Sequence, residues 1–212
     1  MKESIASYVL STQTLIHNAA NNSRLQGQLK EYGYNSQRIQ EATDLLENFK
    51  VQQNEQEALY NDQKERNRQL KVDMATLRAS YREHLAVARF AFRHDTGKQS
   101  WLELEGLRKS SAADYLMQVQ KFYQRVEPLL PQLKKHGAVA EEFAQSKAQV
   151  AAVMALRQQR VNGKGEAEQA TQLRNEAYQA LETWLSGFKQ VARAAFREQP
   201  QLLESLGIKK RS

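Results

Sequence analysis

The sequence repeats itself at an interval of 104 residues, and this repeat limits the possible folds more than any other feature. Residues 25–33 (LQGQLKEYG) resemble residues 129–137 (LLPQLKKHG), and residues 87–93 (VARFAFR) resemble residues 191–197 (VARAAFR). The two matches lie far apart in the chain, yet both keep the same interval without a gap. We therefore predict that the chain contains two copies of one structural unit.

A third match is shifted, because Gly106 resembles Gly207 at an interval of 101 residues. It predicts a linker three residues shorter in the second copy, with boundaries at 1–109 and 110–212. Each glycine is expected to end a final short helix, and the apolar residue after it, Leu107 or Ile208, is expected to fold back onto the preceding turn.

The composition favours helices over strands. Only three prolines and nine glycines interrupt 212 residues, and apolar residues recur every three or four positions. We predict an all-α fold in which each copy is an up-and-down arrangement of several helices. Two copies are too few for a solenoid, so we expect them to pack about a pseudo-two-fold axis as one helical bundle, like a fused homodimer.

Both copies are predicted to begin with a helix and a short second helix. In the first copy the opening helix covers about 4–20, and in the second copy the equivalent helix meets Pro128, which cannot continue it without losing a hydrogen bond. The short helices end at Gly33 and Gly137. Both glycines suit the left-handed position that follows a helix, where a side chain is penalised.

The rest of each copy is predicted to be a pair of helices. The sequence Asn-Gly-Lys-Gly at 162–165 indicates a turn between helices, and we expect an equivalent turn at 58–61. Its alternative is one unbroken helix over 36–93, which the sequence leaves open. The following helices, 62–93 and 166–197, carry heptad-like apolar stripes that suit coiled-coil packing. The polar tip at 52–69 is expected to be an exposed turn, or else a projecting arm that binds a partner.

No catalytic or metal-binding pattern is present. The chain lacks cysteine, which excludes thiolate metal ligands and a cysteine nucleophile. None of its four histidines follows a glutamate by three positions, as di-iron helical bundles require. His84 aligns with Phe188, so we expect it to line the core or the edge of the core. These observations predict a protein that is not an enzyme and that uses no cofactor or metal.

Two arginine pairs form the predicted anion- or partner-binding site. Arg89 and Arg93 lie four residues apart, as do Arg193 and Arg197, so each pair shares a helix face on which like charges repel. The negative end of the helix dipole offers a structural explanation, since it stabilises cations in the last turn. The functional hypothesis is that the two pairs bind an anion or an acidic partner.

The charge is weakly informative about partners. The net charge is +7 and the isoelectric point about 9.5, with the excess of basic residues concentrated between 185 and 212, including Lys209, Lys210 and Arg211 at the end. No apolar run is long enough to cross a membrane, and no secretory signal is evident, so we expect a cytoplasmic protein. The predicted function is a helical scaffold that binds a protein partner or self-associates. The alternative is a nucleic-acid-associated protein that uses the arginine pairs and the basic C-terminal segment.

Overall fold

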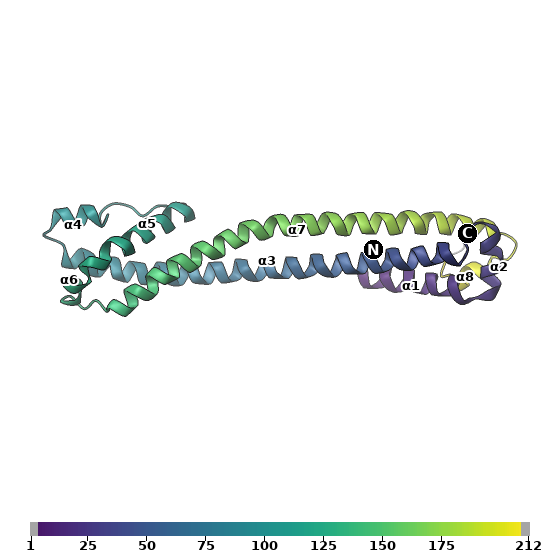
Figure 1. Ribbon diagram of the computed structural model, residues 1–212, viewed down its shortest axis with the longest axis horizontal. Coiled ribbons are helices and arrows are strands. Elements are labelled where there is room, and N and C mark those ends of the chain that lie inside the picture. The colour runs from purple at the N-terminus through teal and green to yellow at the C-terminus, as the bar shows by residue number, and fades with distance from the viewer. Residues whose placement is uncertain (1–3, 209–212) are drawn as a thin grey trace. The chain divides into compact units, whose positions relative to one another are not determined.

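The computed structural model describes residues 4–208, and their regular structure is entirely helical. The all-α prediction is therefore confirmed. None of the helices in this part of the chain combines the length and the apolar character needed to cross a membrane. The elements, shown in Figure 1, are α1 (Ile5–Asn21), α2 (Ser23–Glu31), α3 (Ser36–Ala91), α4 (Thr96–Trp101), α5 (Ala112–Val126), the 3-10 turn η1 (Glu127–Leu129), α6 (Leu130–Lys134), α7 (Ala140–Ala195) and α8 (Gln201–Ser205).

The chain forms two compact units, and each takes part of α3 and part of α7. Unit 2 is the continuous stretch Asn61–Gly165, whereas unit 1 joins the residues up to Tyr60 with those from Glu166 onward. The units therefore do not coincide with the predicted copies 1–109 and 110–212, because each unit combines one half of each copy. The assignment of the two copies stays a prediction.

The predicted turns at 58–61 and 162–165 are absent. For the first copy, the alternative of one unbroken helix is correct, whereas for the second copy the prediction of a turn was wrong. Both α3 and α7 are single helices of 56 residues, each with a contour of about 84 Å at 1.5 Å per residue. The predicted polar tip at 52–69 is therefore the middle of a helix and not an exposed turn (Figure 1). Both ends of α7 lie 104 residues after those of α3, at 140 against 36 and at 195 against 91.

Gly163 and Gly165 were misleading because a turn needs a backbone conformation that they do not adopt. The described glycines with positive φ are at 33, 106, 137 and 207. Inside a helix, a glycine costs only about 1 kcal/mol relative to alanine, which flanking helical residues and packing readily offset. Gly163 is buried, and a Cβ at that position would lie 2.7 Å from a guanidinium nitrogen of Arg66. The absent side chain thus gives room to Arg66.

The core of unit 1 lies where α1, α2 and the start of α3 meet the end of α7 and α8. Its largest fully buried side chains are aromatic, and Phe188 is one of them. The rings of Trp184 and Tyr34 pack around Phe188, with centroids 5.1 and 5.2 Å from its own. At one edge, the Tyr8 hydroxyl donates to Glu182 Oε1 at 2.7 Å. This bond joins α1 to α7, so the N-terminal helix is held to a helix far along the chain.

The core of unit 2 is built in the same way from the later parts of the chain. The end of α3 and the loop after α4 pack on α5, α6 and the start of α7, and the buried rings of Tyr81, Phe122 and Tyr123 lie in contact. Leu77 and Leu181, which lie 104 residues apart, are buried in the cores of units 2 and 1 respectively. Each unit thus has a hydrophobic core of its own.

Glycine ends the short helices as predicted. Gly33 has φ +87° and Gly137 has φ +89°. The residue after each glycine, Tyr34 or Ala138, donates its backbone N–H to a leucine carbonyl five residues earlier, at 2.9 and 3.2 Å respectively. This is the bond of a Schellman cap, which satisfies carbonyls that the helix end leaves free.

The predicted role of Gly106 and Leu107 was wrong. Helix α4 ends at Trp101, and the left-handed position after it is taken by Glu103, with φ +52°. The residue that folds back is Leu104, which is 1% exposed, whereas Leu107 is 95% exposed. After α8, Ile208 does fold back onto the preceding turn as predicted, and it is 3% exposed.

The error came from aligning glycine with glycine. The backbone N–H of Leu104 bonds to the carbonyl of Gln99, and that of Ile208 bonds to Leu203, so these two caps also lie 104 residues apart. Glu103 therefore stands where Gly207 stands, in spite of the strain that a side chain meets at positive φ. The linker of the second copy is consequently not three residues shorter at this cap.

Candidate interaction site

The structure does not bring the four predicted arginines together in one unit. Arg89 and Arg93 belong to unit 2, whereas Arg193 and Arg197 belong to unit 1. All four side chains are exposed. Arg89 and Arg193 lie in the last turns of α3 and α7, where the helix dipole stabilises a cation. The structural explanation therefore fits these two residues.

Arg89 and Arg93 also have intramolecular partners. Arg89 Nε donates to the Leu104 carbonyl at 2.7 Å, which ties α3 to the loop after α4. The Arg93 guanidinium lies 4.6 Å from the Phe90 ring centroid and donates to the Phe90 carbonyl at 3.0 Å. These contacts give both side chains a structural role. The predicted basic tail Lys209, Lys210 and Arg211 lies outside the described residues.

A groove in unit 2 is the strongest candidate site. It is a pocket of about 370 Å³ between α5, η1 and α6 on one side and the start of α7 on the other, a size within the range of ligand pockets. Tyr123 and Phe143 are almost fully buried, whereas the alanines of α7 remain exposed. The lining residues are Tyr123, Val126, Glu127, Leu130, Phe143, Ala144, Lys147, Ala148 and Ala151.

One ion pair joins the two sides of this apolar groove. Lys147 Nζ of α7 lies 2.6 Å from Glu127 Oε2 of η1, and both side chains are about half exposed. At such exposure an ion pair contributes roughly 0–1 kcal/mol, so a ligand can displace it at small cost. Every other lining residue offers an aliphatic or aromatic side chain. The groove therefore suits an apolar ligand with polar groups only at its rim.

A buried polar cluster lies behind Tyr123 and Phe143. The His84 ring stacks on Phe143, with centroids 3.9 Å apart, and His84 Nδ1 lies 2.9 Å from the Tyr123 hydroxyl. His84 is 6% exposed, which confirms that it lines the core. Ser146, also buried, forms a further hydrogen bond with the Tyr123 side chain. The hydrogen bonds and stacking fix both rings that close the inner end of the groove.

Burial keeps these titratable groups uncharged. It lowers the pKa of His84 below its usual 6.5, against an opposing effect of the carboxylates of Glu142 and Glu83. It also raises the pKa of the Tyr123 phenol to about 12, against a smaller lowering by the hydrogen bond with Ser146. The hydrogen bonds and the stacked rings of this cluster hold the inner wall of the groove in place.

Unit 1 contains a pocket at positions that partly match the groove at the 104-residue interval, and its lining mixes polar and apolar side chains. It also measures about 370 Å³. Five of its lining positions lie 104 residues before lining positions of the unit 2 groove, and Gln26, Gln40 and Thr43 stand where the groove has Leu130, Ala144 and Lys147. The other two pairs are Ala19 with Tyr123 and Ile39 with Phe143. Two of the matched positions thus carry glutamine in unit 1 and an apolar residue in unit 2.

Sequence reasoning missed this groove, although a signal for it was present. The 104-residue interval pairs Ala148 with Asp44 and Ala151 with Glu47. A comparison of the two copies position by position would have shown polar residues replaced by alanine on one face of α7. The repeat was recognised only from segments in which the two predicted copies agree. The groove lies at positions where the two copies differ.

The described residues contain no group of three or more histidines and carboxylates placed to hold a metal ion. No family model matches the chain, and neither the curated proteins nor the solved structures include a significant match. The groove and the partly matching pocket of unit 1 are therefore the observations on which a function has to be proposed.

Proposed function

We propose that this protein is a non-enzymatic helical scaffold, and that the apolar groove of unit 2 binds an amphipathic helix of a partner protein. The supporting observation is the contrast between the two partly matching pockets. The pocket of unit 1 has Gln26 and Gln40 at the positions that match Leu130 and Ala144, so an apolar residue at these two positions is not required in both units. Exposed apolar linings are costly in water and usually mark a site that a partner covers.

A helix is the partner that fits the shape of this lining. Ala144, Ala148 and Ala151 follow each other at four and three residues, so they form one stripe along α7. Their short side chains leave space beside the larger Val126 and Leu130 on the opposite wall. An amphipathic helix binds such a groove through apolar residues at the same spacing. The rim pair Lys147 and Glu127 can then contact charges on the polar face of the partner.

The proposal can be tested by a photo-reactive residue at position 148 of the full-length protein. We expect crosslinking in cells to one partner, through a segment whose apolar residues recur at helical spacing. The same residue at Asp44, the matched position in unit 1, is the control and should give no such adduct. Leu130→Gln, which installs the residue of the unit 1 pocket, should abolish the adduct at position 148.

Two results would contradict this function. One is equal crosslinking from positions 148 and 44. The other is an adduct at 148 that Leu130→Gln leaves unchanged while the circular dichroism spectrum shows a folded protein. Leu130 is only partly buried, so this substitution is expected to leave the fold intact.

We further propose that the chain arose by tandem duplication of one unit. Support comes from helix ends, caps and pockets that recur at 104 residues. Each unit contains half of each predicted copy. This arrangement resembles a domain-swapped dimer, in which two copies exchange elements. The pseudo-two-fold arrangement of the copies stays a prediction.

The alternative function is association with nucleic acid, which the net charge of +7 favours. In that case binding would weaken steeply as salt increases, because counterions are released when phosphates are neutralised. Substituting glutamine for Arg89, Arg93, Arg193 and Arg197 should then weaken it. Affinity that barely changes with salt would contradict this alternative.

A further inference from the structure

Three arginines of unit 2 lie beside a pair of packed tyrosines, Tyr81 and Tyr115. The Arg78 guanidinium carbon lies 5.4 Å from the centroid of the Tyr115 ring. Arg82 follows Arg78 by one turn on the same face of α3, since residues four apart are neighbours on a helix. Arg108, in the loop before α5, donates from Nη1 to the Tyr81 hydroxyl at 2.9 Å. The Tyr81 and Tyr115 rings meet edge to face at 5.9 Å.

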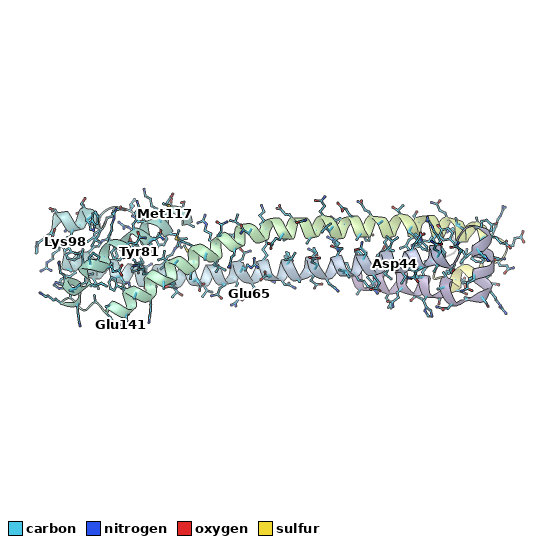
Figure 2. All side chains as sticks on the ribbon, viewed as in Figure 1. Asp44, Glu65, Tyr81, Lys98, Met117 and Glu141 are labelled. Atoms are coloured by element: carbon cyan, nitrogen blue, oxygen red, sulfur yellow. The ribbon has the colours of Figure 1, made fainter. Side chains whose placement is uncertain are left out.

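Packing holds the centre of this cluster in place. Tyr115 is 7% exposed and Tyr81 is 2% exposed, and Figure 2 shows Tyr81 among the packed side chains of its unit. Arg108 Nη2 also donates to the carbonyls of Glu105 and Gly106, at 2.6 and 3.2 Å. The guanidinium of Arg108 is therefore oriented before any ligand arrives.

The three arginines form one positively charged cluster beside the packed rings of Tyr81 and Tyr115. Burial raises the pKa of Tyr115, while the positive charges of Arg78, Arg82 and Arg108 each lower it. Arg78 and Arg82 are exposed to solvent, so a ligand can reach them. Two of the arginines therefore face solvent, while Arg108 is held against the buried Tyr81.

Within the described part of the chain, no carboxylate forms an ion pair with these arginines. Two nearby acids have other partners, because Glu103 pairs with Arg125 at 2.9 Å and Asp114 accepts a hydrogen bond from the Ser111 hydroxyl at 2.7 Å.

The equivalent place in unit 1 has the opposite charge. The position 104 residues after Arg78 is Glu182, whose carboxylate accepts a hydrogen bond from Tyr8. The positions that match Arg82 and Tyr115 are Ser186 and Ser11. The concentration of positive charge is thus a property of unit 2 and not of the shared architecture.

We propose that Arg78, Arg82 and Arg108, with the hydroxyl of Tyr115, bind the phosphoryl group of a small phosphorylated ligand. Guanidinium groups donate paired hydrogen bonds that match phosphate oxygens, and a phenol can add a further donor. A compact cluster of three arginines fits a single phosphate, whereas a nucleic-acid strand needs a basic stripe along its length. This site is distinct from the apolar groove and does not depend on the proposed partner helix.

Calorimetric titration of the full-length protein tests the proposal. The ligands are inorganic phosphate, glycerol phosphate as a phosphomonoester, and a single-stranded oligonucleotide. We expect one phosphate or phosphomonoester per chain, and Arg78→Gln should weaken its binding about tenfold through loss of a charged hydrogen bond. The double variant Arg78→Gln with Arg82→Gln should weaken it further. Stronger binding of glycerol phosphate than of inorganic phosphate would indicate that the site binds an organic phosphate. Stronger binding of inorganic phosphate would indicate that it binds the free ion.

Arg160→Gln is the matched control, because Arg160 is an exposed arginine of the same unit on α7, and it should leave binding unchanged. Tyr115→Phe keeps the buried ring and should weaken binding while the unfolding transition is retained. No binding of either small phosphate would overturn the proposal. So would equal losses for Arg78→Gln and Arg160→Gln, or an oligonucleotide that binds more tightly than both small phosphates.

Discussion

At one matched position, the cores of the two units differ in whether they contain an ionisable side chain. His84 is buried against Phe143 and Tyr123 in unit 2, and the equivalent residue in unit 1 is Phe188. An ionisable ring thus occupies a place where the other unit has an apolar one. The consequence is a pH dependence that only one of the two cores should show.

Protonation of His84 is expected to destabilise unit 2. Its pKa in the folded protein is lowered by burial, so folding favours the neutral ring. The stability that this preference contributes is present above the unfolded pKa of about 6.5 and is lost as the pH falls through the lower folded pKa. Urea unfolding of the full-length protein at pH 7.5 and pH 5 should show this loss.

His84→Phe, which installs the residue of unit 1, should reduce the difference between the two pH values. The carboxylates of Glu142 and Glu83 act on the pKa of His84 in the direction opposite to burial. An unchanged pH dependence in His84→Phe would show that other groups are responsible.

A second prediction concerns the leucines after α4. Leu104→Ala should destabilise unit 2 by about 2–5 kcal/mol, because it removes a buried side chain and leaves a cavity. Leu107→Ala is the matched control and should change stability by less than about 0.5 kcal/mol, since its side chain is in solvent. Thermal unfolding of both variants gives the comparison. Equal effects would mean that the cap is assigned to the wrong leucine.

At the scale of elements, the sequence predicted the ends of helices better than their continuity. Gly33 and Gly137 marked two caps correctly because their positive φ is a requirement of the backbone itself. Gly163 and Gly165 do not end a helix, because glycine is tolerated inside a helix at a modest cost in stability. A single sequence does not show whether a glycine is used or merely tolerated.

The continuity of α7 can be tested at Gly165. A Cβ at this position meets no atom within 4 Å. In an unbroken helix, Gly165→Ala should therefore stabilise the protein by about 0.5–1 kcal/mol, through the smaller entropy of the unfolded chain. Chemical denaturation measures this change. Destabilisation by alanine would instead indicate a turn that needs glycine at position 165.

The candidate sites were missed for a different reason. The groove and the arginine cluster depend on how separate helices and loops pack against each other, as when Arg108 meets Tyr81 of α3. The predicted pair Arg89 and Arg93 was a local pattern, and locally it is explained by the helix end and nearby carbonyls. Periodicity identifies faces of one helix, but it does not identify which other segment covers them.

At the scale of the whole molecule, the main result is that each unit combines the two predicted copies. The core residues of unit 1 come from the stretches 15–49 and 177–208, and those of unit 2 come from 77–104 and 115–153. A cut between the copies at 109 and 110 would therefore divide both cores. This division of the cores explains why α3 and α7 are continuous, because each carries core residues of both units.

The most direct test is to express two fragments of nearly equal length, 61–165 and 1–109. The first contains all of unit 2, and the second contains half of each core. We predict that 61–165 unfolds cooperatively as a monomer, whereas 1–109 fails to fold as a monomer and gains structure only by pairing with another chain. A fragment 1–109 that unfolds cooperatively as a monomer, beside an unfolded 61–165, would contradict the account.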